Sequence, residues 1–151
     1  MSTPPYQYDR RHSTRYTFIS KGRVGAIVKV VEFTPTTAKN ILNLGFGDLL
    51  ADGTIDDIAK TNNNDIVRVL ATVIDIIKDF TTDYPWVKIV FSGSNAIRTS
   101  LYHRILKMYY QNFIINFTIT ALIKEGNGFA EVGFDPSGSA KYFAFLIKRK
   151  L

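Results

Sequence analysis

One stretch of this chain has the apolar spacing of an amphipathic helix, and the segments around it have the character of strands. Between Asp65 and Phe80, apolar residues recur at three- and four-residue intervals, and Asn63 or Asn64 precedes the run as a candidate N-cap. The expected inward face consists of Ile66, Leu70, Val73, Ile77 and Phe80, and Val69, Ile74 and Ile76 widen it. The shorter runs AIVKVVEF and VKIVF are rich in β-branched residues and are bounded by turn-forming residues. A helix with one apolar face buries it against a sheet. The pattern therefore predicts an α+β protein.

Length and composition agree with one domain. The chain has 151 residues, of which 46% are hydrophobic and 13% aromatic, enough for one sizeable core. The absence of cysteine excludes disulfides, thiolate nucleophiles and Cys-ligated metal sites. No run reaches the roughly 18 apolar residues of a membrane span, and the first residues lack the apolar centre of a signal peptide. We expect a cytoplasmic protein that does not contact a membrane.

The elements predict an N-terminal antiparallel meander, two helices packed on one face, and C-terminal strands that complete the sheet, in the order βββ(β)-α-β-α-ββ(β). We expect hairpin turns at Lys21–Gly25 and Asp52-Gly53. A second helix is expected from Asn95 to about Gln111, with an inward face of Ile97, Leu101, Ile105 and Met108. The two or three strands after it are expected to turn at 126–128 and 135–138 and to include KYFAFLIK.

The N-terminal residues show no hydrophobic periodicity. Residues 1–13 mix Pro, Ser and Arg, and we interpret them as a mobile tail that precedes one globular domain over residues 14–151. The net charge of +6 is uneven, because the segments 1–31 and 84–151 are basic and the segment 32–83 is acidic. Such asymmetry allows an anionic partner at one face, and it also occurs on surfaces with no ligand.

The stretch FSGSNAIRTSLYHRIL, Phe91 to Leu106, is the best candidate for a binding site. A strand that passes directly into a helix leaves the first helix amides without intrahelical partners, and the positive helix end favours an anion. The residues that could hold a phosphate or carboxylate there are Ser92, Gly93, Ser94, Asn95, Arg98 and Thr99. The alternative is structural: Ser94 or Asn95 caps the helix and Arg98 pairs with an acid such as Asp48 or Asp57.

Basic and aromatic residues follow on the same predicted helix. Tyr102, His103, Arg104 and Lys107 lie at adjacent positions and are interpreted as one outward flank that could stack bases and contact phosphates. The alternative is that the tyrosine only completes the rim of the core. Neither histidine has a second histidine at helical spacing, so that a His-based zinc site is not expected.

Acidic residues gather in the middle of the chain. Asp48, Asp56 and Asp57 are weak candidates for a metal site in a hydrolase or nuclease, because converging carboxylates bind hard cations. Their spacing fits no calcium loop, and Asp52-Gly53 is explained by turn chemistry. The element order also resembles that of ribonuclease H, but YTFIS and FSGSN carry no acids where that chemistry needs them.

Five segments spread from Tyr16 to Lys150 carry a family resemblance: YTFISKGRVGAIVKVVEF, NLGFGD, IDDIAKTNNNDIVRVLATV, GSNAIRTSLY and YFAFLIKRK. In this order they resemble a family of small, functionally uncharacterised bacterial proteins that is common in Bacteroidetes. In that family the second helix more often begins Arg-Thr-Arg-Leu-Tyr-Arg, so that Ser100 and His103 stand here in place of basic residues. The resemblance implies a single-domain protein and no particular activity.

These patterns favour a non-catalytic binding module with an anion site at the strand-to-helix loop. The ligand would be a phosphate, a nucleotide, another phosphorylated small molecule or nucleic acid, and no cofactor is implied. Two alternatives stay open: a metal-dependent hydrolase or nuclease that uses the acidic middle segment, and a protein-interaction domain with no small ligand.

Overall fold

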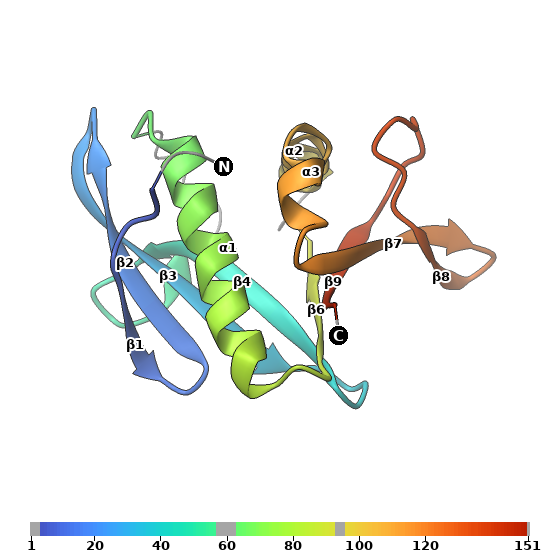
Figure 1. The fold of residues 1–151 in the computed structure, drawn as a ribbon, viewed down its shortest axis with the longest axis horizontal. Coiled ribbons are helices and arrows are strands. Elements are labelled where there is room, and N and C mark those ends of the chain that lie inside the picture. Colours follow the sequence, from blue (N-terminus) through green and yellow to red (C-terminus); the bar gives the residue numbers. More distant parts are fainter. Residues whose placement is uncertain (1–3, 57–62, 93–95, 151) are drawn as a thin grey trace.

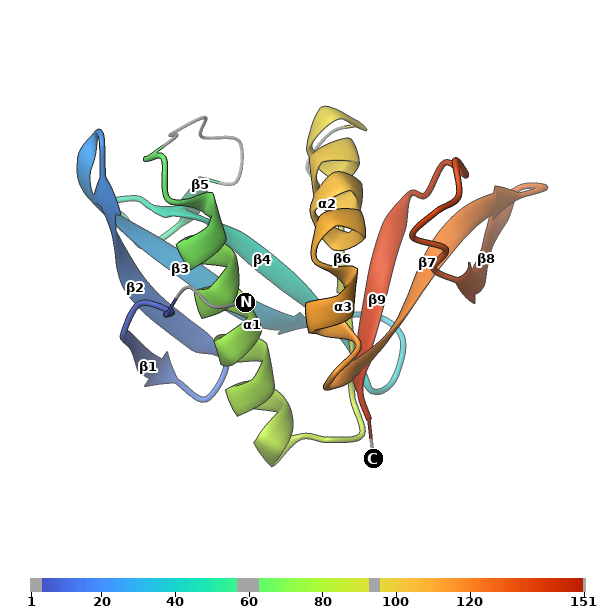
Figure 2. The same cartoon turned by 45° about the horizontal axis from the view of Figure 1, so that its top comes forward.

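The computed structural model describes residues 4–56, 63–92 and 96–150, except for the side chains of Ile97 and Arg98. These residues form nine strands and three helices (Figures 1 and 2). The strands are β1 (Tyr8–His12), β2 (Arg15–Gly22), β3 (Gly25–Pro35), β4 (Ile41–Leu49), β5 (Ile55–Asp56), β6 (Lys88–Phe91), β7 (Phe117–Glu125), β8 (Gly128–Gly133) and β9 (Ala144–Arg149). The helices are α1 (Ile66–Asp83), α2 (Ala96–Met108) and α3 (Tyr110–Phe113). None of the described helices is long and apolar enough to cross a bilayer.

All the described strands join one sheet in the order β1-β2-β3-β4-β6-β9-β7-β8, with β5 paired to β4. Every pairing is antiparallel except β4 with β6. The prediction of a single α+β domain with an N-terminal meander and a C-terminal completion of the sheet is confirmed. The predicted turns also form, with Gly25 and Gly53 at φ of 112° and 88°, values that favour glycine.

The helices lie on one face because of how they connect the strands. β4 and β6 are parallel, and α1 connects them. β6 and β7 are both antiparallel to β9, so they are parallel to each other, and α2 and α3 connect them. Both connections step in the same direction across the sheet, and such crossovers are almost always right-handed, which brings both to the same face. Figure 2 shows α1 and α2 on that common face, as the sequence predicted.

The helix α1 covers the N-terminal half of the sheet with a face slightly rotated from the predicted one. The Phe80 ring stacks on Phe33 of β3, with ring centroids 4.0 Å apart. Ile77 is buried as expected, but Leu70 is only partly buried and Ile66 is 52% exposed. The N-terminal segment, expected to be a mobile tail, also contacts this helix, where the Tyr6 amide donates to the Thr72 hydroxyl at 2.8 Å. The helix extends to Asp83, about one turn beyond the predicted end.

The buried face of helix α2 also differs from the predicted one. Leu106 is its most deeply buried described side chain, whereas Met108, expected to face inward, is 66% exposed. The helix does not continue to Gln111, because a separate short helix begins at Tyr110. Met108 therefore lies at a helix end rather than over the sheet.

The expectation of a mobile tail over residues 1–13 is wrong for the described part of that segment. Tyr8–His12 pair with β2 as strand β1, and Tyr6 is buried against Phe18. The Tyr6 hydroxyl donates to the Asp65 carboxylate at 2.6 Å and accepts from the Lys21 amide at 3.0 Å. The missed signal is the aromatic pair Tyr6 and Tyr8 in YQYD, whose rings pack against Phe18 and Tyr16.

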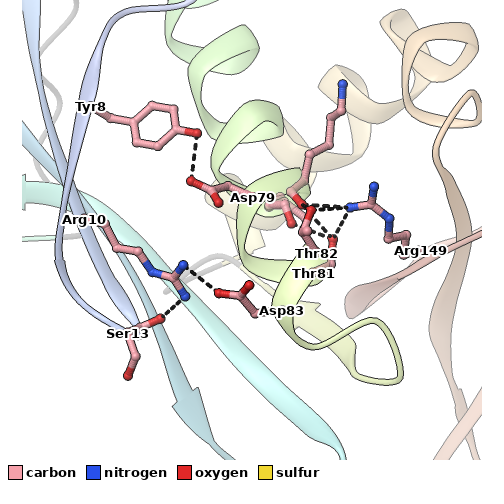
Figure 3. A network of polar contacts seen from close by, with 10 residues as sticks. Tyr8, Arg10, Ser13, Asp79, Thr81, Thr82, Asp83 and Arg149 are labelled. Carbon is pink, nitrogen blue, oxygen red and sulfur yellow. Dashed lines mark hydrogen bonds and ion pairs between the residues drawn. The ribbon is translucent and has the colours of Figure 1, made fainter.

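The C-terminal part of α1 is held by cations from both ends of the chain (Figure 3). Arg10 of β1 forms an ion pair with Asp83 at 2.7 Å. Arg149 of β9 donates to the Lys78 carbonyl at 2.8 Å and to two threonine hydroxyls of the same turn. The last turn of α1 carries no basic residue of its own, so Arg149 supplies the positive charge that complements the helix end.

Removing the Tyr6 side chain should destabilise the fold. Tyr6→Ala deletes a buried ring and leaves the Asp65 carboxylate without one of its donors, so we expect a loss of roughly 3–5 kcal/mol in the free energy of unfolding. Gln7→Ala changes the exposed neighbour and should stay within about 0.5 kcal/mol of the wild type. Urea denaturation of the three proteins measures both effects. Equal midpoints for Tyr6→Ala and the wild type would mean that the segment is a tail after all.

Candidate functional site

The residues predicted to bind an anion lie at the junction of β6 and α2. Of these, Ser92 is exposed and Thr99 is partly buried on α2. Gly93–Asn95 and the side chain of Arg98 lie outside the described residues. The anion-binding role of this loop stays a prediction.

A cavity of about 350 Å³ lies beside this junction, and we call it the α2 cavity. One wall is the N-terminal half of α2, where Ala96, Thr99, Ser100 and His103 follow one another at helical spacing. The opposite wall is the segment 139–143, which precedes β9. Two segments about forty residues apart therefore enclose one space.

The pairing of β6 with β9 explains why these walls meet. The strands are antiparallel, and Phe91, the last residue of β6, pairs with Phe145, the second residue of β9. The chain that leaves β6 toward α2 and the chain that enters β9 therefore lie at the same end of the sheet. The cavity forms between them.

The wall 139–143 was not predicted, because KYFAFLIK was interpreted as one strand. The strand begins only at Ala144, where its pairing with β7 also ends, opposite Leu122. The wall is anchored instead by single hydrogen bonds. The Asp135 amide donates to the Tyr142 hydroxyl at 3.2 Å, and the Phe143 amide donates to the Leu122 carbonyl at 2.9 Å.

The predicted basic and aromatic flank of α2 does not form one outward surface. Because Leu106 faces the sheet, Tyr102 and His103, four and three residues earlier, lie on either side of that buried position. Tyr102 packs edge-on against Phe91 of β6, with ring centroids 5.8 Å apart. Arg104 and Lys107 are exposed as expected. The tyrosine thus belongs to the rim of the core.

His103 lies in an aromatic cluster at the base of the cavity. Its ring is 5.1 Å from that of Tyr142, 5.6 Å from Phe134 and 5.7 Å from Phe145, measured between centroids. Its Nε2 atom is buried and has no hydrogen-bond partner among the described residues. Burial, and to a lesser degree the charge of Lys107, lower the pKa of His103 below its ordinary value. The imidazole is therefore neutral at pH 7 and retains one unused polar atom.

The lining of the α2 cavity is basic rather than acidic. Lys141 is exposed on its outer wall, with its Nζ 5.4 Å from the centre of the Phe143 ring. Hydroxyl groups of Thr99, Ser100 and Ser139 add polar surface, and none of the described residues that line the space carries a carboxylate. Such a lining suits an anion better than a cation.

The acidic candidates for a metal site lie elsewhere. Asp48 of β4 forms an ion pair with Lys29, which is only 8% exposed, on the helix-covered face of the sheet. Asp56 of β5 lies opposite Asp48 across the two strands, while Asp57 lies outside the described residues. No group of three or more potential metal ligands is present in the described part of the chain. The carboxylate of Asp48 is already neutralised by a lysine.

The comparison with protein families agrees with the resemblance in the sequence segments. Residues 2–150 match a family of unknown function, DUF6934. The chain belongs to this family. No curated protein and no solved structure matches it. Because the function of this family is unknown, membership assigns no role to the α2 cavity.

The lowered pKa of His103 predicts a pH dependence of stability in this DUF6934 protein. The unfolded state takes up a proton on His103 more readily than the folded state, so the contribution is full above about pH 6.5 and is lost as the pH falls through the folded-state value. We expect the urea midpoint to fall less between pH 7.5 and 5.5 in His103→Leu than in the wild type.

The second histidine provides the matched control for that experiment. His12 is exposed on β1, and His12→Gln should stay within about 0.5 kcal/mol of the wild type at pH 7.5. Identical pH profiles for His103→Leu and the wild type would show that the imidazole is not held in a neutral, buried environment.

Proposed function

We propose that the protein is a non-catalytic binding module that holds the phosphate group of a small ligand, such as a nucleotide, in the α2 cavity. The observation that supports this most is the buried Nε2 of His103, which has no partner in the described residues and belongs to a side chain that lines a cavity with Lys141 at its wall and no acid in its lining. A buried polar atom without a partner is destabilising, and a ligand oxygen would satisfy it.

The lining offers several groups to a phosphate. Lys141 supplies a positive charge, Ser100 a hydroxyl donor, and His103 an N–H donor when its proton is on Nε2. Ala96, the first residue of α2, also lines the cavity, so the helix-end amides are adjacent.

The aromatic cluster favours a ligand with a planar body beside its phosphate. Tyr142 and Phe143 line the cavity, and planar groups pack well on such rings. A volume of about 350 Å³ lies at the lower end of the range typical of small-molecule sites. A nucleoside monophosphate has both a planar base and a phosphate group.

Binding is favoured over catalysis by what surrounds the histidine. A Ser–His pair that acts as nucleophile and base needs a third group to orient the imidazole, usually a carboxylate. Ser100 and His103 line the same space, but no described carboxylate does. The aromatic rings around His103 provide packing instead.

Substituting Lys141 tests the proposal. Lys141→Gln removes the charge from the wall and should weaken AMP binding about tenfold, the scale of a charge-assisted hydrogen bond at a partly exposed site. Lys124→Gln removes the same charge from an exposed position on β7 and should bind as the wild type does. Isothermal titration at two salt concentrations measures the affinities, and affinity should fall as salt rises.

The Arg98 residue gives an independent variant of the same test. Arg98→Ala should weaken AMP binding by about 1.5–3 kcal/mol with little change in melting temperature if the side chain contacts the ligand. A lower melting temperature with unchanged AMP affinity would instead assign Arg98 to a structural ion pair. If wild-type protein binds neither AMP nor a single-stranded oligonucleotide, the proposed function is wrong.

A further inference from the structure

A second cavity, about 540 Å³ in volume, lies at the β1 edge of the sheet, and we call it the β1–β2 cavity. It exists because β2 is longer than the strand that pairs with it. β1 pairs with Arg15–Phe18 of β2 and leaves the residues from Ile19 to Gly22 beyond its reach. The chain before β1 turns away toward α1, where the Tyr6 amide donates to the Thr72 hydroxyl at 2.8 Å. The Tyr6 hydroxyl bonds to the Lys21 backbone, and no pairing with β1 covers Ile19 and Ser20.

The floor of the β1–β2 cavity is apolar. Ile19 and Val28 face each other across β2 and β3 and are 45% and 40% exposed, although both are branched aliphatic residues. Exposed aliphatic surface in a concave site provides a favourable contact for an apolar ligand body.

Its rim carries three cations against one acid. Arg11 of β1, Lys21 of β2 and Arg68 of α1 all line the cavity. Arg11 is positioned by donating from Nε to the Thr17 hydroxyl at 3.2 Å, and its Nη2 is 3.6 Å from Asp9, the acid of the lining. Such an exposed, loose pair contributes little and leaves the guanidinium available.

The other two cations have no carboxylate within ion-pair distance among the described residues. The Arg68 guanidinium lies over the Tyr6 ring, 3.9 Å from its centroid, which fixes the guanidinium at the rim. Lys21 has its backbone tied to the Tyr6 hydroxyl, so that its side chain extends from a fixed point of the edge. Three positioned cations around an apolar floor form a site for an anionic group joined to an apolar body.

We propose that the β1–β2 cavity is a second binding site, for an organic phosphate or carboxylate whose charge is held by Arg11, Lys21 and Arg68 and whose apolar part covers Ile19 and Val28. The site is independent of the α2 cavity, because the two share no lining residue. It uses the N-terminal segment as one wall, which gives that segment a role beyond stability. The charge and the apolar body are both required, so neutral or purely inorganic compounds bind more weakly.

An NMR titration of the full-length protein separates the two sites. Phenyl phosphate and octanoate serve as the phosphate and carboxylate probes, with phenol and inorganic phosphate as controls that lack one of the two features. We expect saturable shifts of the amides in 9–21 and of Arg68 for at least one of the two probes, with at least about tenfold weaker binding of both controls. Probe shifts confined to 96–103 or absent overturn this inference. Shifts in 9–21 without any response of 96–103 to AMP support it and overturn the proposed function of the α2 cavity.

A double variant tests the cations directly. Arg11→Gln with Lys21→Gln should weaken the tighter probe about tenfold or more, while the control Lys39→Gln with Lys124→Gln removes the same charge from exposed positions and should leave affinity unchanged. If the double variant does not fold, Arg68→Gln, on the exposed surface of α1, should also weaken binding of the tighter probe. Wild-type affinity in the folded variants, or an equal loss in the control, overturns the proposal.

Discussion

Four residues of β6 hold the two halves of the sheet together. β6 pairs through Lys88–Val90 with β4 on one side and through Lys88–Phe91 with β9 on the other. Ile89, at the middle of β6, is completely buried, so this link is also part of the core. Arg149 reinforces the connection, because it extends from the end of β9 to the C-terminal turn of α1, which covers the other half. Without β6 the described strands would form a five-stranded N-terminal unit, β1–β5, and a separate three-stranded unit.

The position of the α2 cavity follows from this link. The end of β6 lies beside the beginning of β9, so the N-terminal half of α2 and the segment 139–143 line one cavity at the same end of the sheet. The chemical character of the cavity follows from the orientation of α2 about its axis. The orientation that buries Leu106 also directs His103 toward an aromatic cluster, where its Nε2 has no partner in the described residues. The cavity therefore combines a basic wall, which suits an anion, with a histidine whose buried Nε2 has no partner among the described residues.

Local chemistry explains which features the sequence predicts. The turns at Gly25 and Gly53 and the long helix α1 depend on neighbouring residues, and they are where the sequence places them. The strand β1, the wall 139–143 and the inward position of His103 depend on partners far along the chain, as when Tyr6 bonds to Asp65, 59 residues away. These long-range contacts decide which face of α2 is buried, and the local spacing of apolar residues in α2 does not encode that face. Candidate residues on α2 could thus be named from sequence, but not the wall that they face.

The most direct test of the account is an experimental structure of the protein crystallised with AMP. We predict AMP density in the α2 cavity, with a phosphate oxygen within hydrogen-bond distance of the Lys141 ammonium and a ligand atom bonded to Nε2 of His103. Clear density for the side chains of this cavity with no AMP between them, at a concentration that saturates binding in solution, would contradict the central claim.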